Sequence, residues 1–211
     1  MNYLINILSK VGIIILFYYA WQNIERVSNI NQNLIYFYLI MVILSLLIDK
    51  FFFKGKKTEN KKTHQTLSTI ISITWFSTLI VPLIEYSYFL RSNKYLTILG
   101  ITTVFVGIII RGLSIKYLGQ YFSRDIETWS KHNVVDSGFY RYIRHPAYLG
   151  NIIQILGFPL ILNAYYSLIL SVLVIFCFLK RIELEEDFLE ENLKGYSQYK
   201  EKTYRLIPFV W

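Results

Sequence analysis

GFYRYIRHPAYLG, residues 138–150, is the stretch that decides the fold. Arg144 and His145 stand directly before Pro146, and a nearly unbroken apolar run follows over residues 149–179. Proline suits the first position of a helix, and it disfavours helical geometry in the residue before it. The stretch therefore predicts a helix that begins at Pro146 and enters a membrane, with Arg144 and His145 held at the water boundary.

A dense group of charges, KRIELEE at residues 180–186, ends the apolar run. The run over 147–179 is too long for one membrane-spanning helix, which needs about 20 residues, and it is short for two. We expect a short helical hairpin that turns at Asn163, with Gly157 and Pro159 kinking its first arm. Such a hairpin returns the charges to the side of the membrane on which it began.

The composition is that of an integral membrane protein. Of the 211 residues, 54% are hydrophobic, 18% aromatic and 17% charged, which is too apolar for a soluble domain of this size. The net charge of +8 comes from basic residues in the loops, so it indicates topology rather than nucleic-acid binding. The single cysteine, Cys177, excludes an intrachain disulfide. The first apolar segment holds Lys10 and lacks a small-residue cleavage site, so we expect a retained span.

The basic residues predict how the chain crosses the membrane. Four candidate spans precede the hairpin, at 3–21, 33–53, 67–90 and 95–115. Lysine and arginine are concentrated in three segments, 49–66, 116–146 and 180–205. These segments share one side of the membrane only if the last apolar run doubles back. We therefore expect both termini and the candidate site to be cytoplasmic, with the lysines of 54–62 contacting anionic lipid headgroups.

The fold class that follows is all-α, a polytopic bundle of about six hydrophobic helices without a Rossmann domain. Residues 1–115 would form the amino-terminal membrane part, and residues 116–211 would carry the site. A further interfacial helix is expected over 183–193, because apolar residues recur along one face of it. Two ionisable residues, Arg111 and Glu85, lie inside spans, where such groups are costly. They differ in depth, so we assign no pairing between them, and structural, snorkelling and site roles stay open for Arg111.

The motifs of several enzyme classes are missing from the sequence. The glycines are scattered singly, so the chain has no dinucleotide fingerprint or phosphate loop. It contains neither a His-Glu-x-x-His motif nor a pair of cysteines, so we expect no metal. What remains is a set of aromatic, cationic and acidic side chains at a membrane surface.

Four motifs in the second half resemble the isoprenylcysteine carboxyl methyltransferase family of integral membrane enzymes. They are HNVVDSGFY at 132–140 leading into RHPAYLG at 144–150, Arg181-x-Glu183-x-Glu185-Glu186, the pair Tyr196 and Tyr199, and TYRLIPF at 203–209. The resemblance covers about 115–211. An Arg-His-Pro motif also occurs in phospholipid N-methyltransferases and membrane sterol reductases, but the four motifs in this order are specific. Gly195 directly abuts Tyr196, where family members usually have residues between.

The resemblance implies that the second half binds S-adenosylmethionine and releases S-adenosylhomocysteine. Matched to the family's motifs, the cofactor would contact His132, Asn133, Val134, Val135, Tyr140, His145, Pro146, Ala147, Tyr148 and Glu185. Arg181 matches the family's substrate-facing arginine and is the expected catalytic residue. Further candidates are Arg144, Glu186, Tyr199 and Arg205, the last two forming, together with Tyr196, a lid that dries the pocket. Taken alone, His132 could merely cap a loop, and Arg141 reads as a topology charge.

The residue chemistry agrees with these roles. A carboxylate acceptor is already ionised at neutral pH, so its methylation needs alignment rather than a general base. Arg181 can grip such a carboxylate with two hydrogen bonds, and Glu185 can accept from the ammonium or ribose hydroxyls of the cofactor.

The sequence thus predicts a membrane methyltransferase acting on a lipophilic acceptor, which would be a small acid or a prenylated or lipidated substrate. The nearest alternative is N-methylation of a phospholipid amine. Arg181 disfavours it weakly, because an arginine repels an ammonium substrate. An NADPH-dependent sterol or enone reductase is disfavoured by the acidic run 183–191. A non-catalytic lipid-binding protein is the third class. Membrane lipids are the expected partners, and nucleic acids are not. The acceptor and the oligomeric state stay open.

Overall fold

The computed structural model describes residues 18, 21, 22, 25, 31–52, 65–123, 126, 128 and 133–209. Within these ranges the regular elements are all helical, which confirms the predicted all-α class. His132, the lysines of 54–62 and all but two residues of the expected span 3–21 lie outside the described residues.

The helices match the predicted spans closely. They are α2 (Gln32–Phe52), α3 (Gln65–Phe89), α4 (Lys94–Leu118), α5 (Pro146–Ile161), α6 (Ser167–Asn192) and α7 (Tyr196–Lys202), with short 3-10 turns at Gly119–Tyr121 and Gly138–Arg141. Among the described residues, two segments are long and apolar enough to cross a membrane, Ile70–Phe89 and Lys94–Tyr121, and two shorter apolar helices cover Gln32–Ile48 and Pro146–Ile161.

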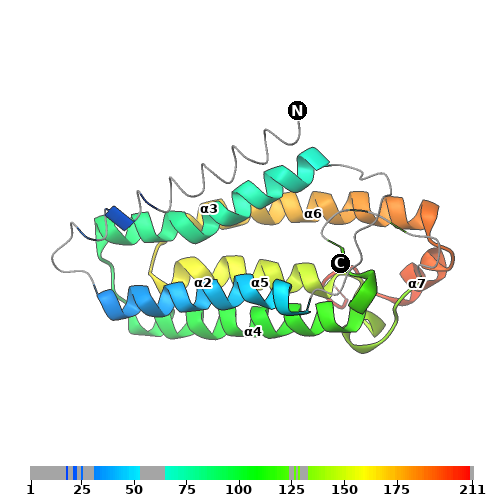
Figure 1. The fold of residues 1–211 in the computed structure, drawn as a ribbon, viewed down its shortest axis with the longest axis horizontal. Helices are drawn as coiled ribbons and strands as arrows, with labels where there is room; N and C mark the ends of the chain where they lie inside the picture. The colour runs from blue at the N-terminus through cyan, green and yellow to red at the C-terminus, as the bar shows by residue number, and fades with distance from the viewer. Residues whose placement is uncertain are drawn as a thin grey trace.

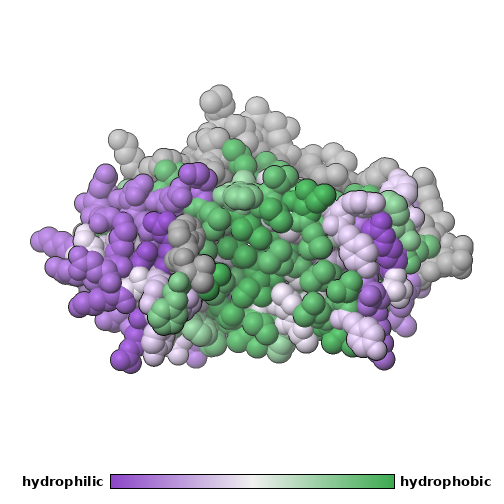
Figure 2. All heavy atoms as spheres, turned by 180° about the vertical axis from the view of Figure 1, so that it is seen from behind, coloured by the Kyte–Doolittle hydropathy of each residue, from purple (hydrophilic) through white to green (hydrophobic). Residues whose placement is uncertain are grey.

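The long helices lie side by side along one axis (Figure 1), with α3 beside α6 and α4 beside α5 and α2. The main core lies between α2, α3, α4 and α5, where Tyr38, Leu83, Val104 and Phe158 are buried. The Tyr38 hydroxyl donates to the Leu79 carbonyl at 2.8 Å, so this polar group is satisfied inside the core. Figure 2 shows that apolar residues form a band across the middle of one face, with hydrophilic residues at both ends. A bundle built for a lipid bilayer has this distribution.

The last apolar run forms the predicted hairpin. α5 ends at Ile161 and α6 begins at Ser167, and the turn between them places Asn163 at φ 55°. Asparagine tolerates this left-handed conformation better than most residues. The Asn163 side chain also donates to Thr97 Oγ1 at 2.9 Å, which ties the turn to the start of α4. The two arms run antiparallel, so the start of α5 and the end of α6 lie at the same end of the molecule.

The prediction of a separate interfacial helix over 183–193 is wrong, because these residues continue α6 without a break to Asn192. No glycine or proline interrupts the chain between the apolar and the charged parts, so nothing ends the helix there. The helix ends at Asn192, because Leu193 takes an extended conformation, and Gly195 follows in the left-handed conformation at φ 85°. Gly195 is also the N-cap residue of α7, which begins at Tyr196.

α4 and α5 touch along their backbones, a contact that the sequence analysis missed. An ideal Cβ on Gly107 would lie 2.8 Å from the Gly150 carbonyl oxygen, and one on Gly157 would lie 3.0 Å from the Gly100 carbonyl oxygen. The glycines are therefore paired across the interface and spaced seven residues apart in each helix. Small residues at such spacing let membrane helices approach closely. The contact fixes where α5 begins relative to α4.

Candidate active site

The two polar clusters that flank the hairpin meet at one end of the bundle. His145, directly before α5, has its Nε2 atom 3.2 Å from Glu186 Oε1 on α6. One turn into α5, the Tyr148 hydroxyl donates to Glu185 Oε2 at 2.6 Å. α7 and the segment 203–209, here called the tail, lie at the same end (Figure 1). The candidate site thus combines three parts of the chain that are distant in sequence.

The chain reaches α5 through a tight turn that needs a glycine. Gly138 has φ 60°, and a Cβ on it would lie 2.5 Å from the Tyr117 ring. The 3-10 turn Gly138–Arg141 buries Tyr140. Pro146 then takes the first position of α5, as predicted, with His145 before it in a non-helical conformation. Local sterics therefore set the direction in which the His145 ring leaves the helix end.

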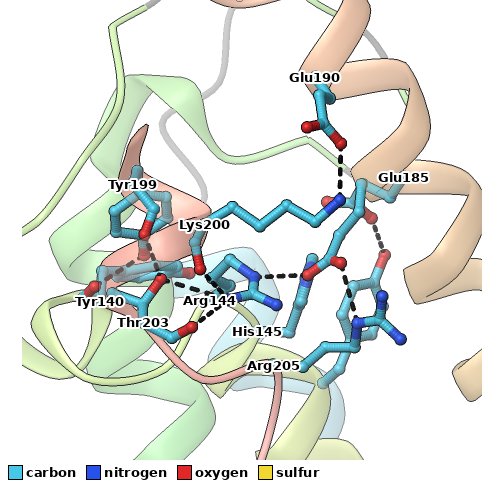
Figure 3. Close-up of polar contacts among 11 residues, drawn as sticks. Tyr140, Arg144, His145, Glu185, Glu190, Tyr199, Lys200, Thr203 and Arg205 are labelled. Atoms are coloured by element: carbon cyan, nitrogen blue, oxygen red, sulfur yellow. Dashed lines mark hydrogen bonds and ion pairs between the residues drawn. The ribbon is translucent and has the colours of Figure 1, made fainter. Parts of the chain in front are cut away.

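Glu186 is the centre of a buried ion-pair cluster with Arg144, His145 and Arg205, the three residues that Figure 3 labels beside it. Its Oε1 atom accepts from Arg144 Nε at 2.6 Å and lies 3.2 Å from His145 Nε2, and its Oε2 atom accepts from Arg205 Nε at 2.9 Å. Burial alone would raise the pKa of Glu186, but the hydrogen bonds and charges of His145 and Arg144 outweigh it and lower that pKa to about 2. Glu186 is therefore ionised, and both of its oxygens are held by the protein.

The tail lies across the start of α5 and is held there by backbone bonds. Arg144 N donates to the Tyr204 carbonyl at 2.8 Å, His145 N donates to the Arg205 carbonyl at 3.1 Å, and Tyr204 N donates to the Tyr142 carbonyl at 2.9 Å. The Arg144 side chain adds bonds to the carbonyl oxygens of Lys200 and Thr203. These contacts make the tail part of the site wall.

α7 supplies a further contact to the same wall. The Tyr199 hydroxyl donates to the Tyr140 carbonyl at 2.7 Å, so α7 is fixed to the turn before α5 (Figure 3). Burial raises the pKa of both phenols, that of Tyr140 and that of Tyr199. Both hydroxyls therefore stay protonated.

A second polar chain lies beside the Glu186 cluster and contains the residues predicted to do the chemistry. Arg181 Nε donates to the Tyr148 hydroxyl at 2.6 Å, and that hydroxyl in turn donates to Glu185. Arg181 is buried, with 5% of its surface exposed, whereas Glu185 and Tyr148 are half-buried. The Tyr148 ring packs between His145 and Phe178, at centroid distances of 5.7 and 5.6 Å. Arg181 and Glu185, predicted from separate motif positions, are thus joined through one side chain.

The remaining predicted residues lie around these two clusters. Pro146 is buried and Ala147 is half-buried in the first turn of α5. Asn133, Val134 and Val135 lie in the irregular segment that precedes the Gly138 turn, where Asn133 is exposed and both valines are half-buried. Within the described ranges, no group of three or more His, Cys, Asp or Glu residues is placed to hold a metal ion.

Two residues with open roles have clear positions. Arg111 reaches the site: its NH1 atom donates to the Ala147 carbonyl at 3.2 Å. Glu85 lies at the opposite end, where it accepts from the backbone N–H groups of Tyr166 and Ser167, at 3.0 and 2.8 Å, and pairs with Arg91 at 3.0 Å. Glu85 therefore caps α6, and it was the depth difference from Arg111 that correctly argued against pairing the two.

Tyr196 was expected as a part of the lid with Tyr199 and Arg205, and its surroundings make it a candidate cofactor contact as well. Its side chain is buried at the start of α7, and its hydroxyl has no hydrogen-bond partner among the described residues. Burial and the nearby charges of Glu186 and Glu185 raise the pKa of this phenol. A buried donor without a partner is rare in folded proteins, so the Tyr196 hydroxyl is a candidate donor to a bound group.

Comparisons with known proteins agree on one family. The model of the isoprenylcysteine carboxyl methyltransferase (ICMT) family matches residues 98–191. A protein-S-isoprenylcysteine O-methyltransferase of Saccharomyces cerevisiae is 35% identical over 129 residues, which are 59% of this chain. The alignment spans 54% of that relative, so the chain matches only about half of its length.

Two further similarities extend over nearly the whole chain. Protein-S-isoprenylcysteine O-methyltransferase A of Arabidopsis thaliana is 28% identical over 199 residues, covering 89% of this chain and 95% of the relative. A solved structure of the eukaryotic intramembrane Ras methyltransferase ICMT superposes with a TM-score of 0.50 at 17% identity, covering 96% of this chain and 93% of the other. The structural similarity shows that the fold is shared.

Proposed function

Because residues 98–191 match the model of the isoprenylcysteine carboxyl methyltransferase family, we propose that the protein is a member of this family, a membrane methyltransferase that methylates the carboxylate of a lipophilic, isoprenylcysteine-type acceptor. The observation that carries this proposal is the polar chain from Arg181 through Tyr148 to Glu185. It places a buried cation and an acid at one end of the hairpin, as a reaction between an anionic acceptor and a cationic donor requires.

The residues present fit S-adenosylmethionine as the methyl donor. Glu185 offers a carboxylate to the ammonium group or the ribose hydroxyls, and the buried Tyr196 hydroxyl offers a donor that has no protein partner. The Tyr148 ring provides an aromatic face of the kind that attracts sulfonium and other cations. His132, Asn133, Val134, Val135, Tyr140, His145, Pro146 and Ala147 would complete this cofactor site. When bound, the cofactor supplies an electrophilic methyl group.

The protein's own contribution is alignment and exclusion of water. A free carboxyl group has a pKa of about 3.3–3.7, so the acceptor arrives ionised and needs no base. Arg181 holds and aims this carboxylate, and correct positioning of two reactants is worth on the order of 7–11 kcal/mol. The tail, fixed by Arg205 and Arg144, would cover the site and keep water out, which would strengthen the attraction between Arg181 and the carboxylate.

The proposal includes a location in the membrane. Residues 1–115 would anchor the protein, and residues 116–211 would form the catalytic half, with several helices crossing the bilayer. The hydrophilic end that carries α7 would face the cytoplasm together with both termini. An acceptor with a prenyl or other lipid tail would then reach the site from the bilayer, with membrane lipids as neighbours.

A transfer assay tests the function directly. We expect the purified protein to move a radiolabelled methyl group from S-adenosylmethionine to S-farnesylcysteine, and to leave phosphatidylethanolamine unlabelled because buried Arg181 repels an ammonium acceptor. Labelling of the phospholipid alone would establish N-methylation instead, and labelling of neither would refute the proposal.

Two variants separate the proposed roles of Arg181 and Glu185. Arg181→Ala should bind S-adenosylhomocysteine within about threefold of the wild type, yet lose transfer by at least about 100-fold, since charged hydrogen bonds to the acceptor disappear. Glu185→Ala should weaken S-adenosylhomocysteine binding by at least about 10-fold in calorimetry. Glu183→Ala is the control, because Glu183 pairs only at the surface with Lys180. Equal loss of binding in both site variants would contradict the division of roles.

A further inference from the structure

The Tyr148 hydroxyl is placed between the two residues to which the proposed function assigns opposite tasks. It accepts from Arg181 Nε and donates to Glu185 Oε2, both at 2.6 Å. The direction of these two bonds is forced, because arginine has only donors and a carboxylate has only acceptors. A hydroxyl is the group that can accept on one side and donate on the other, so phenylalanine could keep the ring but not the connection.

The bond at Nε has a geometric consequence for Arg181. The guanidinium group is planar, and its Nε–H bond lies in that plane. An acceptor at Nε therefore fixes the plane and with it the direction of the terminal nitrogens that grip a carboxylate. Because Arg181 stands on α6 and Tyr148 on α5, the bond also ties this orientation to the hairpin rather than to the arginine's own flexible stem.

The surroundings of Tyr148 keep its hydroxyl in place. Its ring packs against Phe178 and His145, and the Arg181 guanidinium centre lies 5.9 Å from the ring centroid. The Tyr148 hydroxyl donates a short hydrogen bond to Glu185. A lone pair of the hydroxyl oxygen is thereby directed at Arg181. The orientation of Arg181 is thus set by a chain that ends on the proposed cofactor ligand.

We propose that Tyr148 is a positioning residue for the acceptor: its hydroxyl, anchored on Glu185, orients the Arg181 guanidinium toward the acceptor carboxylate. This inference rests on the proposed function and adds a specificity device to it. The site distinguishes a free acid from its methyl ester because Arg181 is aimed at two carboxylate oxygens, and Tyr148 maintains that aim. The ester product has lost the negative charge that Arg181 holds, so it binds more weakly than the acid and leaves the site.

The test is a binding comparison with S-adenosylhomocysteine present, using S-farnesylcysteine and its methyl ester as ligands. In Tyr148→Phe we expect affinity for the acid to fall by about 10- to 100-fold, as for a lost hydrogen bond to a charged group, while affinity for the ester stays within about threefold. Tyr142→Phe is the matched control, because Tyr142 is 62% exposed and outside both polar clusters of the site. Equal weakening of both ligands, or of neither, would overturn the inference.

A second variant tests whether Tyr148 acts through Arg181. Arg181→Lys keeps the charge but removes the planar fork, so it should lose the same discrimination between acid and ester. In the Arg181→Lys background, Tyr148→Phe should then change the affinity for the acid by less than about threefold. The effects of the two substitutions would therefore not add up. Full additivity would show that Tyr148 acts independently and would contradict the proposal. Failure of the wild type to bind S-adenosylhomocysteine or the acid would instead refute the proposed function.

Discussion

Glu185 and Glu186 are adjacent in sequence, but they have different surroundings. Successive helix positions point about 100° apart, so Glu186 enters the buried cluster of Arg144, His145 and Arg205 while Glu185 lies beside Tyr148. The sequence analysis favoured Glu185 as the cofactor ligand and kept Glu186 as a further candidate. Because the protein's own cations occupy both oxygens of Glu186, its position supports a structural role.

Replacing Glu186 with glutamine should destabilise the protein at neutral pH. The substitution leaves buried Arg144 without its ion-pair partner, and loss of one member of a buried pair costs about 3–5 kcal/mol. We expect a lower midpoint of thermal unfolding in detergent. Glu183→Gln is the control, since the exposed pair of Glu183 and Lys180 contributes about 0–1 kcal/mol. An unchanged midpoint for Glu186→Gln would contradict the central role of this carboxylate.

The same substitution should alter the pH dependence of stability in a defined window. The pKa of Glu186 is lowered from 4.5 to about 2 on folding, so its ionised form stabilises the fold fully above pH 4.5. That contribution is lost as the pH falls from 4.5 toward 2. The difference in unfolding midpoint between the wild type and Glu186→Gln should therefore be constant near neutrality and narrow through this acidic window. If the difference in unfolding midpoint widened between pH 4.5 and 2, the pKa of Glu186 would be raised on folding rather than lowered.

The roles of Arg111 and Glu85 show what a sequence cannot supply at this scale. Hydropathy and charge identified both residues as costly, which is correct, but their partners are a backbone carbonyl on α5 and backbone N–H groups of α6. Every residue carries such groups, so no sequence pattern marks them. Tyr196 is similar: its residue type matched a family motif, but only its burial without a hydrogen-bond partner marks it as a site residue.

At the scale of helices, the glycine pairs of α4 and α5 set the position of the site. Gly150 lies one turn after Ala147, and an ideal Cβ on it would lie 2.8 Å from Arg111 Cβ. Any side chain there pushes α5 away from α4 and moves the Arg111–Ala147 contact with it. Arg111 thus depends on a glycine to reach the first turn of α5.

Gly150→Ala should therefore lower stability by about 1–3 kcal/mol, the usual cost of overpacking a tight interface. Thermal unfolding in detergent measures the change, and S-adenosylhomocysteine affinity should fall with it because the start of α5 shifts. Thr102→Ile on the exposed face of α4 adds more volume without touching α5, and it should have little effect on either measurement. A stable Gly150→Ala variant with wild-type affinity would contradict backbone contact at this point.

The hairpin itself could be predicted because two independent patterns agreed on it. The length of the apolar run allowed a turn, and the basic segments at 116–146 and 180–205 required one. The end of α6 could not be predicted in the same way. An amphipathic pattern over 183–193 looks the same whether it forms a separate helix or continues the preceding one. The helix also ends before Leu193, which is not a helix-breaking residue type, so the sequence does not mark the end.

For the described part of the molecule, the sequence analysis recovered the all-α class, the helices expected over 33–53, 67–90 and 95–115, and the two clusters that meet. What it could not recover is the arrangement inside each cluster, because that depends on helix rotation and on which backbone groups are exposed. The tail is an example. Tyr199 and Arg205 were proposed as parts of a lid, and their contacts with Tyr140 and Glu186 place them over the start of α5, while their effect on water in the pocket stays a prediction.

Removing residues after Lys202 should expose the start of α5. The amides of Arg144 and His145 donate to carbonyls of Tyr204 and Arg205, so truncation deletes both acceptors. We expect faster hydrogen exchange at these two amides, with exchange in α4 unchanged, measured by mass spectrometry of peptides covering 138–150. The truncated protein should also bind S-adenosylhomocysteine more weakly. Unchanged exchange at both amides would show that the tail does not protect this corner.

The pairing of Tyr204 and Arg205 with the chain before α5 also sets the order in which the candidate site is assembled during synthesis. The hairpin is complete in sequence once α6 has been translated, but the wall of the site also needs backbone from Tyr204 and Arg205. While those two residues are still inside the ribosomal exit tunnel, the amides of Arg144 and His145 lack their acceptors. The candidate site is therefore among the last parts of the described chain to form.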